Sequence, residues 1–168
     1  DELIQITIPS SVTSIGDNAF SSSKLTQIIF TIPSSVNSIG EYAFHLCNRL
    51  TQITIPSSVT SIGEGAFDSS SLTQVTFTIP SSVTEIRENA FSYCTSLKQI
   101  TIPSSVTSIG KFAFCRCYEL IQITIPSSVT SIGNYAFYGC FSLEQIEFTE
   151  PSSLTEIGKK AFSECTSL

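Results

Sequence analysis

The fold is decided by the stretch LTQITIPSSVTSIGEGAF, residues 50–67, because the same pattern recurs along the whole chain. The seven prolines lie 23 to 25 residues apart, and a phenylalanine follows each at the eleventh position: Pro9, Pro33, Pro56, Pro80, Pro103, Pro126 and Pro151, with Phe20, Phe44, Phe67, Phe91, Phe114, Phe137 and Phe162. A fixed period in this range is typical of a solenoid, whose units pack only on their neighbours. We therefore expect residues 1–168 to form a single domain of about seven units of 23–25 residues.

Each unit begins with a short strand. In residues 50–55 the apolar Ile53 and Ile55 alternate with polar residues, which predicts a strand with one buried face, and Leu50 completes the buried set. Pro56 has no backbone N–H and must turn the chain out of the ladder. A Ser-Ser pair follows every repeat proline and is suited to bond backbone groups that the turn leaves unpaired. A catalytic serine would not be needed seven times, so we interpret these serines as structural.

The second half of each unit is expected to form a short helical or 3-10 turn. From Ile39, the apolar Ala43 and Cys47 follow at the fourth and eighth positions, which is a helical spacing. A glycine stands at the start of this segment in six of the seven units, which predicts either a positive φ or a close approach of the next unit. Arg87 takes the place of this glycine in the fourth unit.

Three units carry two extra residues between the strand and the proline. The step from leucine to proline is eight residues instead of six in the ranges 25–33, 72–80 and 143–151, where we expect a small bulge. In the first two of these units one residue is missing between the repeat phenylalanine and the leucine. The insertions are therefore either a local compensation or a raised recognition edge, and the sequence supports both interpretations.

Five of the six cysteines stand three residues after a repeat phenylalanine: Cys47, Cys94, Cys117, Cys140 and Cys165. This register predicts a column of buried thiols, because free cysteine behaves as a small hydrophobic residue. Side chains in register on adjacent rungs point in parallel, so disulfides are possible but not required. The spacing of Cys115 and Cys117 is too close for an ordinary pair of metal ligands, and His45 is the single histidine. We predict no metal site.

Composition and motifs exclude several classes of function. A net charge of −6 and a pI near 4.6 argue against nucleic-acid binding, which needs a clustered positive face. No apolar run approaches the roughly 20 residues that cross a bilayer, so no transmembrane segment is expected. A glycine-rich phosphate loop and a nucleophile elbow are both missing from the sequence, and we predict neither enzymatic activity nor a cofactor.

The pattern Leu-x-x-Ile-x-Ile-Pro-x-x-Val-x-x-Ile-Gly-x-x-Ala-Phe-x-x-Cys, matched almost throughout residues 3–168, resembles the BspA-type leucine-rich repeats. The resemblance implies an α/β-type repeat solenoid, a curved, right-handed stack with a parallel β-sheet on its concave side and the short turns on its convex side. The family is common on the surfaces of anaerobic bacteria and parasitic protists and is associated with adhesion, which implies a cell-surface or secreted location.

The solvent-facing strand positions are the candidate ligand-binding residues. Counted from the leucine, the third place is always glutamine, the fifth is mostly threonine, and the second varies most. Stacked glutamines are expected to form a ladder of amide hydrogen bonds, and variation on this constant frame is where specificity can be placed. The predicted site is Gln5, Thr7, Gln27, Ile29, Gln52, Thr54, Gln74, Thr76, Lys98, Gln99, Thr101, Gln122, Thr124, Glu144, Gln145 and Glu147.

The sequence supports three functions. The leading hypothesis is a protein-binding module for surface adhesion or for interaction with a host or partner protein. The alternative is a cytoplasmic scaffold or regulator, suggested by regularly spaced unpaired thiols and by a missing secretion signal. The third is a self-associating structural repeat, because the chain begins and ends inside a repeat without a polar cap, which predicts end-to-end homodimers of a fragment.

Overall fold

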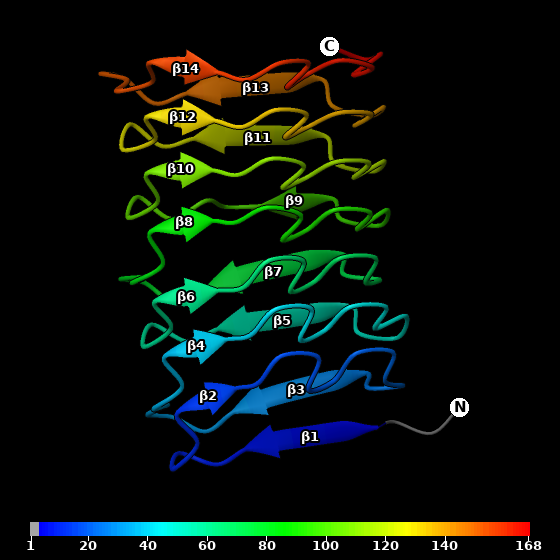
Figure 1. Ribbon diagram of the computed structural model, residues 1–168, viewed down its shortest axis with the longest axis vertical. Coiled ribbons are helices and arrows are strands. Elements are labelled where there is room, and N and C mark those ends of the chain that lie inside the picture. The colour runs from blue at the N-terminus through cyan, green and yellow to red at the C-terminus, as the bar shows by residue number, and fades with distance from the viewer. Residues whose placement is uncertain (1–3) are drawn as a thin grey trace.

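The protein is a parallel β-solenoid in a computed structural model that describes residues 4–168 (Figure 1). Each unit contributes one odd-numbered and one even-numbered strand, and the two ends of the chain lie at opposite ends of the stack. The odd-numbered strands are β1 (Gln5–Ile8), β3 (Gln27–Phe30), β5 (Gln52–Ile55), β7 (Gln74–Phe77), β9 (Gln99–Ile100), β11 (Gln122–Ile125) and β13 (Gln145–Phe148). The even-numbered strands are β2 (Ser14–Ile15), β4 (Ser38–Ile39), β6 (Ser61–Ile62), β8 (Glu85–Ile86), β10 (Ser108–Ile109), β12 (Ser131–Ile132) and β14 (Glu156–Ile157). The predicted solenoid with parallel strands is confirmed.

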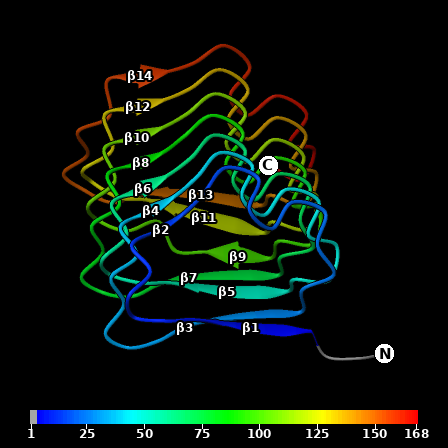
Figure 2. The same ribbon diagram turned by 60° about the horizontal axis from the view of Figure 1, so that its bottom comes forward.

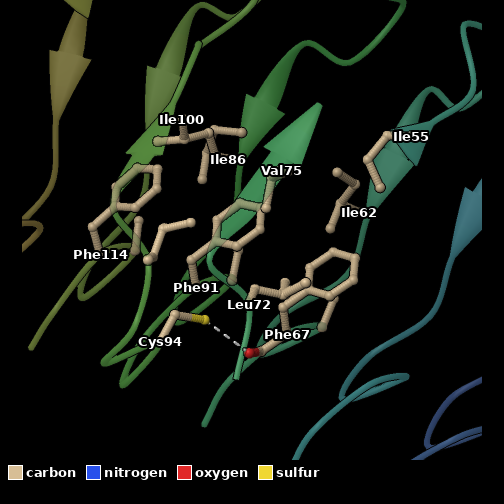
Figure 3. Close-up of a cluster of buried hydrophobic side chains, with 14 of the residues drawn as sticks. Ile55, Ile62, Phe67, Leu72, Val75, Ile86, Phe91, Cys94, Ile100 and Phe114 are labelled. Atoms are coloured by element: carbon tan, nitrogen blue, oxygen red, sulfur yellow. Dashed lines mark hydrogen bonds between the residues drawn. The ribbon is translucent and has the colours of Figure 1, made fainter. Parts of the chain in front are cut away.

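The core is a set of columns that run along the stack. Alternate residues of β5 point inward and outward, so Ile53 and Ile55 are buried while the residues between them are exposed. The repeat phenylalanines form the central column, with neighbouring ring centroids 5.1 to 5.5 Å apart and ring planes nearly parallel (Figure 3). Because each of the five inner rings lies between two others, every inner unit shares its apolar surface with both neighbours, as expected for a repeat protein.

The odd-numbered strands form one side of the solenoid and the even-numbered strands form another (Figure 2). The third side, which we name the turn wall, consists of residues 16–25, 40–50, 63–72, 87–97, 110–120, 133–143 and 158–168. The expected helical or 3-10 turns are wrong, since the described residues contain no helix. Two residues in each unit, four positions apart as in Tyr42 and Leu46, have a positive φ that interrupts any helical run. Every second residue from Tyr42 to Leu46 donates to the next unit instead, as Phe44 N–H does to the carbonyl of Ala66 at 2.7 Å. The spacing from Ile39 is shared by a helix and by this turn, because both bring every fourth side chain to the core.

The repeat glycines permit the close approach of adjacent units. A Cβ on Gly63 would lie 2.6 Å from the carbonyl carbon of Gly40, and none of the six glycines has a positive φ, so the close approach is confirmed and the positive φ is wrong. Gly110 N–H donates to the carbonyl of Ile86 at 2.7 Å. Among the described residues Arg87 N–H donates no such bond to the carbonyl of Ile62, and the even-numbered strands divide there into β2-β4-β6 and β8-β10-β12-β14.

The insertions follow the paired strand residues and leave their register intact. The register between β1 and β3 runs unbroken from Gln5 with Gln27 to Ile8 with Phe30, so the extra pair forms a protruding bend after the strand and not a bulge within it. In each of these three units the peptide bond before the repeat proline is cis, at Pro33, Pro80 and Pro151. The odd-numbered strands pair in three blocks, β1-β3, β5-β7-β9 and β11-β13.

The cysteine column is confirmed. Each thiol donates to the carbonyl of the repeat phenylalanine in the preceding unit, as Cys94 does to Phe67 at 3.1 Å (Figure 3). All six cysteines are free. Burial raises the pKa of the Cys94 thiol to about 12. In the two units that lack this cysteine, Ser23 and Ser70 take its place, and the Ser70 hydroxyl lies 3.4 Å from the Cys94 sulfur.

Candidate interaction surface

The sixteen predicted residues form one continuous surface over the odd-numbered strands, which we name the Gln face. Fifteen of them are exposed and Gln74 is half-buried, because the alternation along each strand directs them away from the core. Gln52, Gln74 and Gln99 stand in register on β5, β7 and β9. The structure therefore brings the predicted residues together, and their role in binding stays a prediction.

The glutamine ladder is not formed. In the part of the chain that the structure describes, no hydrogen bond joins the side-chain amide of one glutamine to that of the next, although their backbones pair directly. The amides face solvent, where each retains its capacity to donate and to accept. Such groups can orient a protein ligand without the desolvation penalty of a buried charge.

Charge on the Gln face is confined to its C-terminal part. Lys98 pairs with Glu119 at 3.7 Å, and both side chains are more than half exposed, so this ion pair adds little stability. Glu147 accepts a hydrogen bond from the hydroxyl of Thr124 at 3.4 Å. Glu144 is exposed beside it, which gives the predicted acidic end of the face.

The bends formed by the inserted residues border two apolar hollows at the edge of the Gln face. The larger, about 450 Å³, lies between the bends of the second and fourth units and is lined by Ile29, Ile32 and Pro56 among others. The second, about 300 Å³, lies beyond the fourth unit against Ile79. The inserted Ile32 is 93% exposed and Ile79 is 83% exposed, which is unusual for isoleucine. The predicted site missed both residues, although the inserted Thr-Ile pairs marked the place where the repeat changes.

Comparison with known proteins agrees with this architecture. The sequence model of the BspA type leucine rich repeat region matches residues 1–96 and 76–168, in 6 copies. The chain belongs to the BspA-type leucine-rich repeat family. No curated protein matches the sequence.

Solved structures of bacterial leucine-rich repeat proteins resemble this BspA-type chain along nearly its whole length. The protein TpLRR of T. pallidum has a TM-score of 0.86 and 29% identity over 99% of this chain and 78% of that one. A leucine-rich repeat protein of Eubacterium ventriosum has a TM-score of 0.85 and 30% identity over 96% of this chain and 43% of that one. The pneumococcal vaccine antigen PcpA has a TM-score of 0.75 and 26% identity, with 96% and 48% covered. This chain therefore spans less than half the length of the last two.

The BspA-type repeat carries no recognisable catalytic or metal centre in residues 4–168. No group of three potential metal ligands occurs among these residues, and no helix there is long and apolar enough to span a bilayer. His45 Nδ1 lies 3.1 Å from a carboxylate oxygen of Asp68, whose pKa is raised by burial although the His45 charge opposes that shift. The hydroxyl of Ser69 donates to the Asp68 carboxylate at 3.3 Å, which is not the order of contacts in a Ser-His-Asp triad.

Proposed function

We propose that the chain is a protein-binding module that engages a partner through the Gln face and the apolar hollows at its edge. Leucine-rich repeat proteins are in general protein-interaction modules. The observation that carries the proposal is the exposure of Ile32 and Ile79 beside a broad face of uncharged polar side chains. A protein interface typically combines an apolar centre with a polar surround, and these residues supply both.

Rigidity supports this function. Thirteen of the sixteen predicted residues stand on paired strands. The bends stand directly after the strands, as in Thr78, whose N–H donates to the Ile55 carbonyl at 2.9 Å. A surface that is ordered before binding loses less conformational entropy when the partner docks. Ile29 and Ile32 flank the same hollow and are suited to act as apolar anchors for a side chain of the partner.

We infer a cell-surface or secreted location and a role in adhesion to a host or partner protein. Support comes from the family, whose members are typically surface or secreted bacterial proteins, and from the pneumococcal relative, which is a vaccine antigen. The cytoplasmic scaffold is the alternative. The free thiols do not decide between them, because five of the six are buried, and burial shields those five from oxidants in either compartment. Labelling intact cells with a membrane-impermeant reagent separates the two, since a cytoplasmic protein stays unlabelled.

The binding experiment compares two variants of equal charge. Thr54→Glu with Thr76→Glu places two carboxylates at the centre of the Gln face, whereas Asn37→Glu with Thr84→Glu places them at exposed positions beside the even-numbered strands. Immobilised wild-type chain and both variants are used to capture surface proteins of candidate partner cells. We expect one partner to be retained by the wild type and the control and lost by the Gln-face variant. Equal retention by all three chains would overturn the proposal.

A further inference from the structure

Three bends rise along the edge of the Gln face, one in each unit that carries inserted residues. They connect β3 to β4, β7 to β8 and β13 to β14, on one side of the stack (Figure 1). The residue before the repeat proline is Ile32 in the first bend, Ile79 in the second and Glu150 in the third, and all three are exposed. Along the stack, the edge therefore presents two apolar side chains and then an acidic one.

The two hollows lie between these bends and contain no charge. The larger hollow lies over the third unit, where Ile32 and Pro56 are among its lining residues. The smaller hollow extends over the fifth and sixth units, from Ile79 to Thr149. None of the residues that line either hollow is charged. Each hollow therefore suits an apolar side chain of a partner, and neither offers a counter-ion to a charged one.

Negative charge begins where the smaller hollow ends. Glu147 stands in register with Thr124, which lines that hollow, and accepts a hydrogen bond from the Thr124 hydroxyl at 3.4 Å. Glu150 follows Thr149, another lining residue, and accepts the Ser152 N–H at 2.9 Å. Neither carboxylate forms an ion pair with a cation of residues 4–168. The uncharged edge therefore ends at two carboxylates that a basic group of a partner can neutralise.

The distances between the hollows and the carboxylates follow from the spacing of the units. Neighbouring parallel strands lie about 4.8 Å apart. The larger hollow is centred on the third unit and the smaller one between the fifth and sixth, so their centres lie roughly 12 Å apart. The carboxylates belong to the seventh unit and lie roughly 7 Å beyond the smaller hollow.

An extended peptide segment that lies along the edge matches these distances. Such a segment rises about 3.3 Å per residue and directs alternate side chains to the same side. Its side chains i, i+4 and i+6 point to one side and are separated by about 13 Å and then by about 7 Å. Apolar side chains at the first two positions therefore reach the two hollows, and a cation at the third reaches the carboxylates.

The polar side chains of the hollows favour an extended segment over a helix. A helix satisfies its backbone N–H and carbonyl groups internally, whereas an extended segment leaves them open. Gln27 lines the larger hollow and Thr101 lines the smaller one. Each of these side chains can both donate and accept a hydrogen bond. They can bond the open backbone of the segment while its apolar side chains enter the hollows.

We propose that the edge of the Gln face binds an extended segment of a partner protein that carries two apolar side chains four residues apart and a lysine or arginine two positions beyond one of them. The assignment rests on the proposed protein-binding function and specifies which part of the partner is recognised. The apolar side chains occupy the hollows, and the cation lies at Glu147 and Glu150. The net charge of −6 on the chain also attracts a basic segment.

The test measures binding of synthetic peptides by fluorescence polarisation. One labelled peptide consists of serine and threonine with leucine at its second and sixth positions and lysine at its eighth, and another has the same residues in reverse order. We expect one of them to bind the wild-type chain saturably. Moving one leucine to the adjacent position is expected to weaken this binding about tenfold, because the side chain then points away from its hollow. Ile79→Ser is expected to weaken it by a similar factor.

A charge exchange tests the acidic end. Glu147→Lys with Glu150→Lys is expected to weaken binding of the lysine peptide about tenfold and to favour the same peptide with glutamate in place of lysine. Glu85→Lys with Glu156→Lys is the matched control, because it changes the charge equally on the even-numbered strands. This control is expected to bind the lysine peptide several times more tightly than the Gln-face variant does. Circular dichroism and thermal melting establish that every variant is folded.

Several outcomes overturn the proposal. One is equal affinity for the lysine and glutamate peptides, and another is tighter binding of a helical peptide with leucines on one face. Self-association that Ile32→Ser abolishes, without binding of either extended peptide, assigns the hollows to a second copy of the chain. Capture of a protein through the Gln face without binding of either extended peptide overturns the extended segment alone. Failure of both capture and peptide binding overturns the proposed function as well.

Discussion

Replacing one repeat glycine by alanine is expected to separate neighbouring units, and the effect depends on which glycine is changed. In Gly133→Ala the new Cβ would lie 2.6 Å from the carbonyl carbon of Gly110, well inside ordinary van der Waals contact. The two units must move apart locally. The bond from Gly133 N–H to the Ile109 carbonyl, 2.7 Å long, is then lost.

The expected change in the free energy of unfolding follows from the hydrogen bonds between these two units. The separation also weakens the bond from Thr130 N–H to the Thr107 carbonyl, 2.8 Å long, and two backbone hydrogen bonds contribute about 1–3 kcal/mol together. Alanine restricts the unfolded chain and offsets about 0.4–1 kcal/mol of this loss. We expect Gly133→Ala to lower the free energy of unfolding by about 1–2 kcal/mol.

Gly16→Ala is the matched control, because a Cβ at Gly16 has nothing within 4 Å. With no contact to disturb, this variant is expected to raise the free energy of unfolding by about 0.4–1 kcal/mol. Urea titration of both variants measures the difference. If the two substitutions changed stability equally, the close approach of units would not be the reason for glycine. The division of the sheet at Arg87 is the natural counterpart of the Gly133 substitution.

Three further predictions concern the phenylalanine column, the cysteine column and the apolar edge of the Gln face. Phe91→Ala removes a fully buried ring with partners on both sides and should cost about 3–5 kcal/mol, whereas the half-buried, terminal Phe162→Ala should cost clearly less in the same titration. The folded-state pKa of Cys94 is about 12, whereas the unfolded value is near 8.5. Between these two pH values only the folded chain keeps the thiol proton, so stability falls by about 1.4 kcal/mol per pH unit there and is unaffected by this group below pH 8.5. Cys94→Ser should therefore reduce the loss between pH 8 and pH 10 by about 2 kcal/mol, and an unchanged loss would contradict the assignment. Ile32→Ser with Ile79→Ser should leave the melting temperature unchanged but abolish partner capture, and retained capture would exclude the apolar edge from the site.

The sequence was sufficient to predict the features that repeat every two residues along a strand or once in every unit. Alternation along residues 50–55 predicted which strand residues are buried, and constant spacing predicted the columns of phenylalanine and cysteine. These predictions succeeded because both features depend only on which side of the chain a residue occupies. The exposure of Gln52 and its counterparts follows from the same alternation.

The turn wall could not be predicted in the same way. Its conformation depends on two positive-φ positions in each unit, and the usual glycine or asparagine signal for them is scattered. Asn18, Gly65 and Asn89 carry it, whereas Tyr42 and Leu46 do not. The predicted glutamine ladder is wrong for another reason. Backbone register fixes where each glutamine side chain leaves its strand, but it does not fix the direction in which the amide points. The break in the even-numbered sheet coincides with the one unit in which Arg87 replaces the repeat glycine, and the sequence alone does not give the distance between units that makes this exchange matter.

The two sheets and the turn wall contribute differently to the cohesion of the stack and to recognition of a partner. Both sheets are interrupted, whereas the hydrogen bonds of the turn wall join every successive pair of units, from Phe20 N–H to the Ala43 carbonyl through Phe137 N–H to the Ala161 carbonyl. The turn wall therefore holds the stack together where the sheets do not, and its backbone has little freedom to accommodate a ligand. Its outward side chains remain free to vary, since Asn18 and Phe112 occupy equivalent turns. The turn wall is therefore a fixed backbone with variable side chains, while the Gln face retains hollows at its edge for a partner of different shape.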